Sequence, residues 1–169
     1  MESKIAAPRI TPNLWFNKNA EDAVNFYLSV FKNSKINAST KFDEAGFEIH
    51  KMPAGTVMTI DFELDGQSFV ALNGGPMFTF TEAISFIVNC ETQEEIDHYW
   101  DALKEGGDEK SQVCGWLKDK FGVSWQIVPS MLTDILKKGN DKHTSNMMSA
   151  MMQMKKLDIS KLQEAYDKA

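Results

Sequence analysis

Two stretches of the chain alternate apolar and polar residues on both sides of a glycine. Residues 57–64 and 68–72 alternate around the turn Asp65-Gly66, a pattern that predicts a β-hairpin. Residues 114–129, CGWLKDKFGVSWQIVP, repeat this arrangement with Gly122 at the turn. Glycine readily adopts the positive φ that tight hairpin turns need. We therefore expect two hairpins of similar construction.

Two other segments carry apolar residues at helical spacing. Residues 20–31 follow Asn19, a plausible N-cap, and place acidic residues in the first turn, where the helix dipole favours them. Residues 92–104 begin with Thr92 as the cap. Each helix has an apolar stripe suited to packing on a sheet; the stripes are Val24, Tyr27, Leu28 and Phe31, and Ile96, Tyr99, Trp100 and Leu103.

The elements recur in the same order along the chain. Residues 10–16 and 83–89 are short apolar segments, each followed by one of the helices and later by one of the hairpins. Residues 36–42 predict a further strand in the first copy, and residues 43–55 a loop or irregular strand. The second copy is shorter between its helix and its hairpin. This order predicts a duplicated strand-helix-strand-strand-strand unit.

The predicted fold class is α+β, with two βαβββ modules and a helical C-terminal tail. Residues 1–138 contain the paired modules, at about 10–76 and 83–129, and then a helix. Residues 139–169 form a helical extension with five methionines between residues 146 and 155. A tail of this length does not fold alone, so we expect it to pack on the body of the protein or on a partner subunit.

Composition and charge narrow the classes of partner. The net charge of −6 argues against nucleic acid, which is bound by clustered lysine and arginine. No run reaches the roughly 18 apolar residues of a membrane-spanning helix. The two cysteines, Cys90 and Cys114, lack C-x-x-C spacing, which indicates reduced thiols. We expect a cytoplasmic protein that associates with neither membrane nor nucleic acid.

Several stretches resemble one branch of a known superfamily. They are EDAVNFYLSVF, DGQSFVALNGGP, AISFIVNCETQEEIDHYWDAL, GWLKDKFGVSWQIVPS and the tail AMMQMKKLDISKLQEAYDKA. Together they are similar to the PhnB-like, 3-demethylubiquinone-9 3-methyltransferase-like branch of the vicinal oxygen chelate superfamily, which includes glyoxalase, bleomycin-resistance proteins and extradiol dioxygenases. The resemblance implies a glyoxalase-like fold of curved sheets and a homodimer.

The resemblance also implies where a metal ion would bind. The ligands of this superfamily, usually His or Glu, lie on the first and last strand of each copy. The matching positions here are Pro12, Val70, Ile84 and Gln126. Of these, Gln126 alone has a side-chain atom that can ligate a metal, and it brings no charge. We therefore expect no metal and no cofactor.

The candidate pocket residues are few and polar, or aromatic. Gln126 lies on the same strand face as Ser124 and could orient a ligand, or it could be a buried amide bonded to neighbouring backbone. Asn73 is a pocket residue or a turn former. The aromatic candidates line a pocket or belong to the core; they are Trp15, Trp116, Trp125 and Phe78. Lys118 and Asp119 are expected to be a solvated pair near the turn.

Two function classes fit these features. The first is a metal-independent protein that binds a small aromatic or apolar organic molecule. The second is an enzyme of the superfamily that acts on a small organic substrate as an isomerase, a lyase or the methyltransferase that the branch is named for. The second class rests on analogy with the fold. A ligand that is returned unchanged would favour the first class, and conversion would favour the second.

Overall fold

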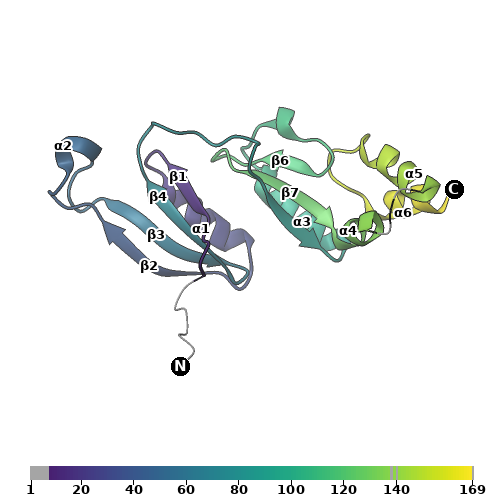
Figure 1. The fold of residues 1–169 in the computed structure, drawn as a ribbon, viewed down its shortest axis with the longest axis horizontal. Helices are drawn as coiled ribbons and strands as arrows, with labels where there is room; N and C mark the ends of the chain where they lie inside the picture. Colours follow the sequence, from purple (N-terminus) through teal and green to yellow (C-terminus); the bar gives the residue numbers. More distant parts are fainter. Residues whose placement is uncertain (1–7, 138, 140, 169) are drawn as a thin grey trace, which may run out of the picture. The chain divides into compact units, whose positions relative to one another are not determined.

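The computed structural model describes residues 8–137, 139 and 141–168. The described chain divides after Thr79 into two compact units, each with its own sheet and helices (Figure 1). The predicted α+β class with a helical tail is confirmed.

The first unit is a four-stranded mixed sheet with one long helix on one face. Its strands are β1 (Asn13–Phe16), β2 (Lys35–Lys41), β3 (Val57–Leu64) and β4 (Gln67–Asn73), in the order β1-β4-β3-β2. Helix α1 (Ala20–Val30) packs on β3 and β4 (Figure 1). A one-turn helix, α2 (Phe47–His50), lies in the segment expected to be a loop. The βαβββ order predicted for the first copy is therefore present.

The hairpin between β3 and β4 turns where the sequence predicts it. Asp65 and Gly66 both have positive φ, at 47° and 79°. Two successive positive φ values are the requirement of a type I′ turn, whose twist matches that of the flanking strands. The two strands pair from Leu64 opposite Gln67 onward.

The second unit repeats the arrangement with three strands. Strands β5 (Phe86–Cys90), β6 (Trp116–Lys118) and β7 (Ser124–Pro129) form a sheet in the order β5-β7-β6. Helix α3 (Gln93–Lys104) covers one face (Figure 1). The shorter connection after α3 contains the 3-10 helix η1 (Glu109–Ser111) and a single bridge between Val113 and Trp116. It holds no counterpart of β2 among the described residues.

The two copies match in a slightly different register from the one that the sequence suggests. Aligning the two helices by their shared tyrosines in the sequence places Tyr27 on Tyr99. In the structure the equivalent buried positions are Tyr27 and Trp100, and Tyr99 is half-buried. The first strands of the two copies are shifted further. Val70 and Gln126 are equivalent positions, each four residues after a turn glycine, and they lie opposite Asn13 and Ile87 respectively, so Asn13 corresponds to Ile87. Positions that are equivalent in burial and in strand pairing differ from those matched by residue identity. The alignment of the two helices and of the two first strands by identity is therefore wrong.

The C-terminal tail packs on the second unit of the same chain. It contains α4 (Ser130–Lys137), α5 (Lys142–Met151) and α6 (Ile159–Asp167). Five buried side chains form its core, with Val128 of β7 packed against them; they are Leu132, Ile135, Met147, Leu157 and Leu162. The backbone N–H groups of Cys114 and Gly115 donate to the carbonyls of Met154 and Lys155, both at 2.8 Å. The methionine-rich stretch is thus an apolar helix face in a hydrophobic core.

Within the described part of the chain, none of the helices is long and apolar enough to cross a membrane.

Candidate ligand-binding face

The second sheet leaves one face uncovered by α3. Side chains directly opposite on paired strands share a face, so Trp116 (β6), Gln126 (β7) and Ile87 (β5) form one row across all three strands. Trp116 and Gln126 are half-buried, and the Ile87 side chain is 56% exposed. A central amide with an indole on one side and an aliphatic group on the other can recognise an organic molecule.

The hydrogen bonds of this row are incomplete. The Gln126 Nε2 donates to Ser85 Oγ at 2.9 Å. Within the described residues, the Gln126 Oε1 accepts no hydrogen bond, and the Trp116 Nε1 donates none. A carbonyl acceptor and an indole donor are therefore both available beside apolar surface. The sequence alternatives for Gln126 included bonding to neighbouring backbone, and its observed partner is instead the Ser85 side chain.

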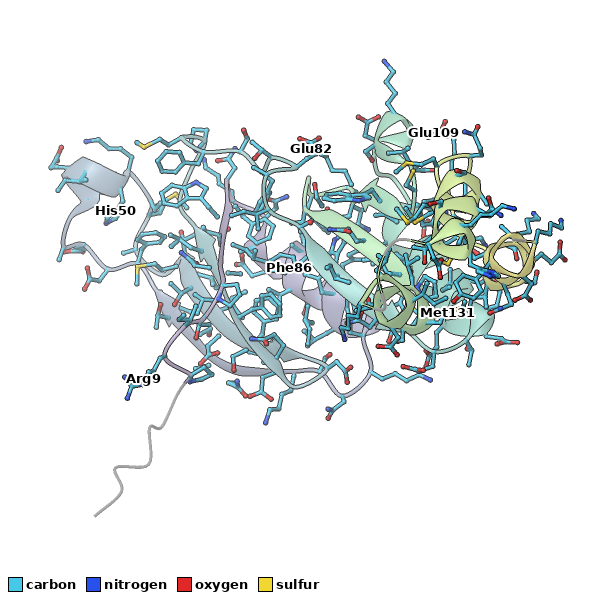
Figure 2. All side chains as sticks on the ribbon, turned by 45° about the vertical axis from the view of Figure 1, so that its right-hand side comes forward. Arg9, His50, Glu82, Phe86, Glu109 and Met131 are labelled. Atoms are coloured by element: carbon cyan, nitrogen blue, oxygen red, sulfur yellow. The ribbon has the colours of Figure 1, made fainter. Side chains whose placement is uncertain are left out.

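Ser124 and Lys118 form the next row on the same face. They are directly opposite across the β6–β7 pair. The Ser124 hydroxyl is buried and has no hydrogen-bond partner among the described residues. The Lys118 Nζ forms an ion pair with Glu82, which lies in the segment that leads into β5 and is labelled in Figure 2. The pKa of Glu82 is lowered, chiefly by the hydrogen bond from Lys118.

The opposite face of the sheet is packed. Trp125 is 2% exposed and lies among buried residues, with the Phe86 ring centroid 5.5 Å from its own. Its Nε1 donates to Asp119 Oδ2 at 2.8 Å. Trp125 therefore does not share a face with Gln126. The expectation of a solvated Asp119 is wrong, because its carboxylate is buried and holds the turn and the indole together.

Trp15 and Phe78 come together in the first unit. Their rings meet edge to face, with centroids 4.9 Å apart, and the Trp15 Nε1 donates to the Gly75 carbonyl at 2.9 Å. Gly74 is required beside them, because a Cβ there would lie 2.4 Å from the Trp15 ring. Trp15 is half-buried and Phe78 is exposed, so this pair is an accessible aromatic surface.

Asn73 connects a strand end to a helix start. Its Oδ1 accepts from the Ala20 N–H at 2.9 Å, and its Nδ2 donates to Glu21 Oε2 at 2.7 Å and to the Val57 carbonyl at 3.0 Å. Asn73 is 1% exposed. Its amide is fully used by the protein.

The seven predicted pocket residues thus separate into distinct groups. Gln126, Trp116 and Ser124 share the open face of the second sheet, Trp15 and Phe78 meet in the first unit, and Asn73 and Trp125 are buried. Ser85, Ile87 and Lys118 belong to the same open face but were absent from the predicted set. Their positions follow from strand pairing, which the sequence alone indicated only approximately.

The positions implied for a metal do not fit a divalent ion. The Val70 N–H donates to the Pro12 carbonyl at 2.9 Å, so both belong to the first sheet's edge pairing. In the second unit Gln126 meets the Ser85 hydroxyl, not a His or Glu. No group of three His, Cys, Asp or Glu that could hold an ion occurs in the part of the chain that the structure describes. Neutral amide and hydroxyl groups compensate poorly for the lost hydration of such an ion.

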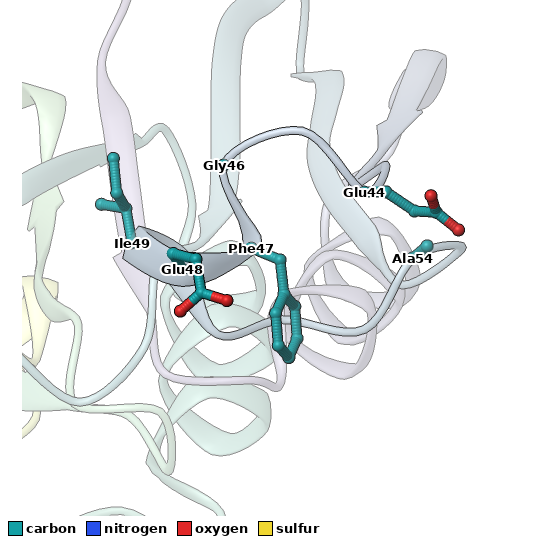
Figure 3. A pocket seen from close by; sticks show the side chains of 6 residues that line it. All are labelled: Glu44, Gly46, Phe47, Glu48, Ile49 and Ala54. Carbon is teal, nitrogen blue, oxygen red and sulfur yellow. The ribbon is translucent and has the colours of Figure 1, made fainter.

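Three surface hollows are lined by other residues. One of about 420 Å³ lies beside α2 and is lined by Phe47, Glu48 and Ile49 among others (Figure 3). Another, of about 920 Å³, lies between the start of α3 and the segment before α6. A third, of about 480 Å³, follows α3. None of the predicted pocket residues lines these three hollows.

The two cysteines have different surroundings. Cys90 is buried, and burial raises the pKa of its thiol to about 12, with the charges of Glu95 and Glu91 adding to the effect. Cys114 is half-buried, with its Sγ 3.7 Å from the Met152 sulfur. A thiol with a raised pKa is a poor nucleophile, so Cys90 is structural.

Comparison with known proteins places the chain in a family. The family model described as 3-demethylubiquinone-9 3-methyltransferase matches residues 8–128. A comparison with curated proteins finds no match. A solved structure from Bacillus cereus, titled a putative 3-demethylubiquinone-9 3-methyltransferase, PhnB protein, is 38% identical; the match covers 72% of this chain and 99% of that one, with a TM-score of 0.63.

More distant structures share the fold. A Pseudomonas aeruginosa protein is 21% identical, with a TM-score of 0.56 over 73% of this chain and 98% of that one. The fosfomycin resistance protein FosX of Listeria monocytogenes is 15% identical, with a TM-score of 0.50 over 78% of this chain and 98% of that one. These two show the glyoxalase-like fold alone. The family model and the Bacillus cereus relative show more: this chain belongs to the PhnB-like, 3-demethylubiquinone-9 3-methyltransferase family.

Proposed function

We propose that the protein binds a small aromatic or apolar organic molecule on the open face of its second sheet, without a metal ion. The observation that carries this proposal is the Gln126 amide at the centre of the Trp116–Gln126–Ile87 row, whose Oε1 has no hydrogen-bond partner among the residues that the structure describes. An unsatisfied carbonyl oxygen between two apolar side chains is suited to orient a ligand, while the indole and the isoleucine contribute contact area.

The other predicted residues have supporting roles in this proposal. Trp125 and Asp119 hold β7 from behind, and Asn73 fixes the start of α1 in the first unit. Trp15 and Phe78 offer a second, independent aromatic surface. We also propose the homodimer that the family resemblance implies.

The alternative function is catalysis on the bound molecule, in the manner that the family's methyltransferase description names. The two functions differ in the fate of the ligand. A binding protein returns it unchanged, whereas an enzyme converts it.

Native mass spectrometry of the protein purified from cells tests the proposal directly. We expect an organic mass retained by each subunit and no stoichiometric divalent ion, and the same spectrum reports the number of subunits. A stoichiometric divalent ion would contradict the metal-independent proposal. Recovery of a converted product from the ligand would support the enzymatic alternative.

Variants then locate the site. Gln126→Ala should weaken binding of the retained ligand about tenfold, the usual effect of losing one hydrogen bond to a partly buried group. Gln67→Ala, at an exposed glutamine of the first unit, is the matched control and should leave affinity unchanged. Equal affinity in both variants would show that the molecule binds elsewhere.

A further inference from the structure

The open face carries a positively charged side chain that has no role in the function proposed above. Lys118 shares this face with Trp116, two residues earlier on β6, and with Ser124 opposite. Its side chain is 23% exposed, whereas the other ion-paired lysines are 34–74% exposed. Partial removal from water strengthens the attraction between an ammonium group and an anion.

The Lys118 ammonium group already forms an ion pair with a carboxylate of the protein. The Glu82 side chain, 61% exposed, reaches the Lys118 Nζ from the turn that precedes β5. Unlike the ion pairs between residues three apart on a helix, it joins positions far apart in the sequence. The exposed partner can leave at low cost, because an ion pair with one solvated member contributes little net stability.

Beside Lys118 lies a polar group that has no hydrogen-bond partner in the described part of the chain. The Ser124 hydroxyl is buried and unbonded within the described residues, and buried hydroxyls normally find a hydrogen-bond partner. A ligand carboxylate bound on this face, over the Lys118–Ser124 pair, would accept hydrogen bonds from both the hydroxyl and the ammonium group.

We propose that the open face selects a small organic carboxylate, whose acid group replaces Glu82 on Lys118 while its aromatic or apolar body lies on Trp116. This inference rests on the proposed function and names its ligand class. Side chains two residues apart on one strand face are about 7 Å apart. An arylalkanoic acid spans this distance, and a hydrogen-bond donor on its body would meet Gln126 Oε1.

Matched pairs of probes test the charge. The first pair is 3-phenylpropanoate and 3-phenylpropanamide, followed by other acid and amide pairs of the same shape, each titrated by calorimetry near pH 7.5. We expect the acid to bind about tenfold or more tightly than the amide. Lys118→Met should bring this ratio close to one, whereas Lys120→Met, at an exposed lysine of the same turn, should leave the ratio unchanged.

A second variant tests the displacement. Glu82→Gln removes the internal competitor, so the acid should bind about 1.5- to 5-fold more tightly and the amide should be unaffected. This change increases affinity, so it cannot arise from a misfolded variant. Loss of acid affinity in Glu82→Gln would overturn the displacement.

The outcomes separate the two proposals. If acid and amide bind equally and Gln126→Ala weakens both, the carboxylate inference is overturned and the proposed function survives. If neither member of any pair binds, the proposed function fails and the carboxylate inference fails with it. A Lys118→Met variant that keeps the preference for acids would place the anion elsewhere and overturn the assignment.

Discussion

Asp119 shows how one buried carboxylate organises the second hairpin. Its Oδ1 accepts from the backbone N–H groups of Phe121 and Val123, at 2.8 and 3.0 Å, and its Oδ2 accepts from the Trp125 indole at 2.8 Å. The first two bonds close the turn, and the third holds β7 from the side away from the open face. The position of Gln126 therefore depends on a residue on the other side of the sheet.

Replacing Asp119 should destabilise the protein. Asp119→Ala removes the three hydrogen bonds that the carboxylate accepts, and we expect a loss of about 2–4 kcal/mol in the free energy of unfolding. Asp119→Asn keeps one oxygen but faces a donor with an NH₂ group, so about 1–3 kcal/mol should be lost. Denaturant titration measures both. Asp43→Asn, at an exposed carboxylate, is the control, and an equal effect there would contradict the role of Asp119.

Gly74 and Gly75 differ in what a side chain would meet. Gly74→Ala places its Cβ 2.4 Å from the Trp15 ring, whereas the Gly75 position is open but has φ of 87°. We expect Gly74→Ala to displace the indole from Phe78 and shift the tryptophan emission. Gly75→Ala should cost about 1 kcal/mol of backbone strain without moving the ring. Unchanged emission in Gly74→Ala would show that the ring position is not fixed by this contact.

Interactions between residues close together in the chain could be predicted from the sequence. The Gly66 turn was predictable because a two-residue type I′ turn is encoded in adjacent residues. The burial of Asp119 was not, because charged residues beside a turn are usually solvated and the indole that binds it becomes a neighbour only through the strand pairing. Gln126 was identified by its strand face, but Ser85, Ile87 and Lys118 required the register of the sheet.

At the scale of elements, the two helices begin in different ways. Thr92 caps α3 locally, with its side chain accepting from the Glu95 N–H at 3.2 Å. Asn19 stands at the start of α1 but makes no side-chain capping bond. The Ala20 N–H is satisfied instead by Asn73, from the end of β4. The position of the helix start was predictable from the sequence, whereas its capping residue was not, because Asn73 is distant along the chain.

Substitutions should separate these two asparagines. Asn73→Ala removes three hydrogen bonds at a buried position, and we expect a loss of about 2–4 kcal/mol in unfolding free energy. Asn19→Ala should change it by less than about 0.5 kcal/mol, since its side chain makes no cap. Thermal unfolding of both variants measures the difference. A larger effect at Asn19 would mean that the local cap operates in solution.

For the whole molecule, the C-terminal helices extend the second unit. The family model ends at residue 128, and α4, α5 and α6 lie beyond it. The sequence predicted that this tail packs on something, because its apolar faces cannot fold alone. It could not identify the surface, which is Val128 together with the backbone of Cys114 and Gly115. The tail therefore packs beside the strands that present Trp116 and Gln126.

Acid should loosen this tail before the sheets unfold. Asp158 caps α6, accepting hydrogen bonds from the Ser160 hydroxyl at 2.7 Å and the Lys161 N–H at 3.1 Å. These bonds lower the pKa of Asp158 to about 2. A carboxyl whose pKa is lower in the folded state stabilises that state above its unfolded pKa of about 4, and this stability is lost as the pH falls from there to about 2.

Hydrogen exchange at α6 amides measures this effect. Because the carboxylate is partly exposed, we expect a loss of about 1 kcal/mol of protection in that pH range, with smaller changes in α1 of the first unit. Asp158→Asn can still accept these hydrogen bonds but does not titrate, so its protection at α6 should vary less with pH than in the wild type. If protection at α6 depends on pH equally in the variant and in the wild type, the acid sensitivity arises from another group. The tail packs against β7, which also carries the open face. If acid weakens ligand binding in the same pH range, α6 and the open face belong to one cooperative unit.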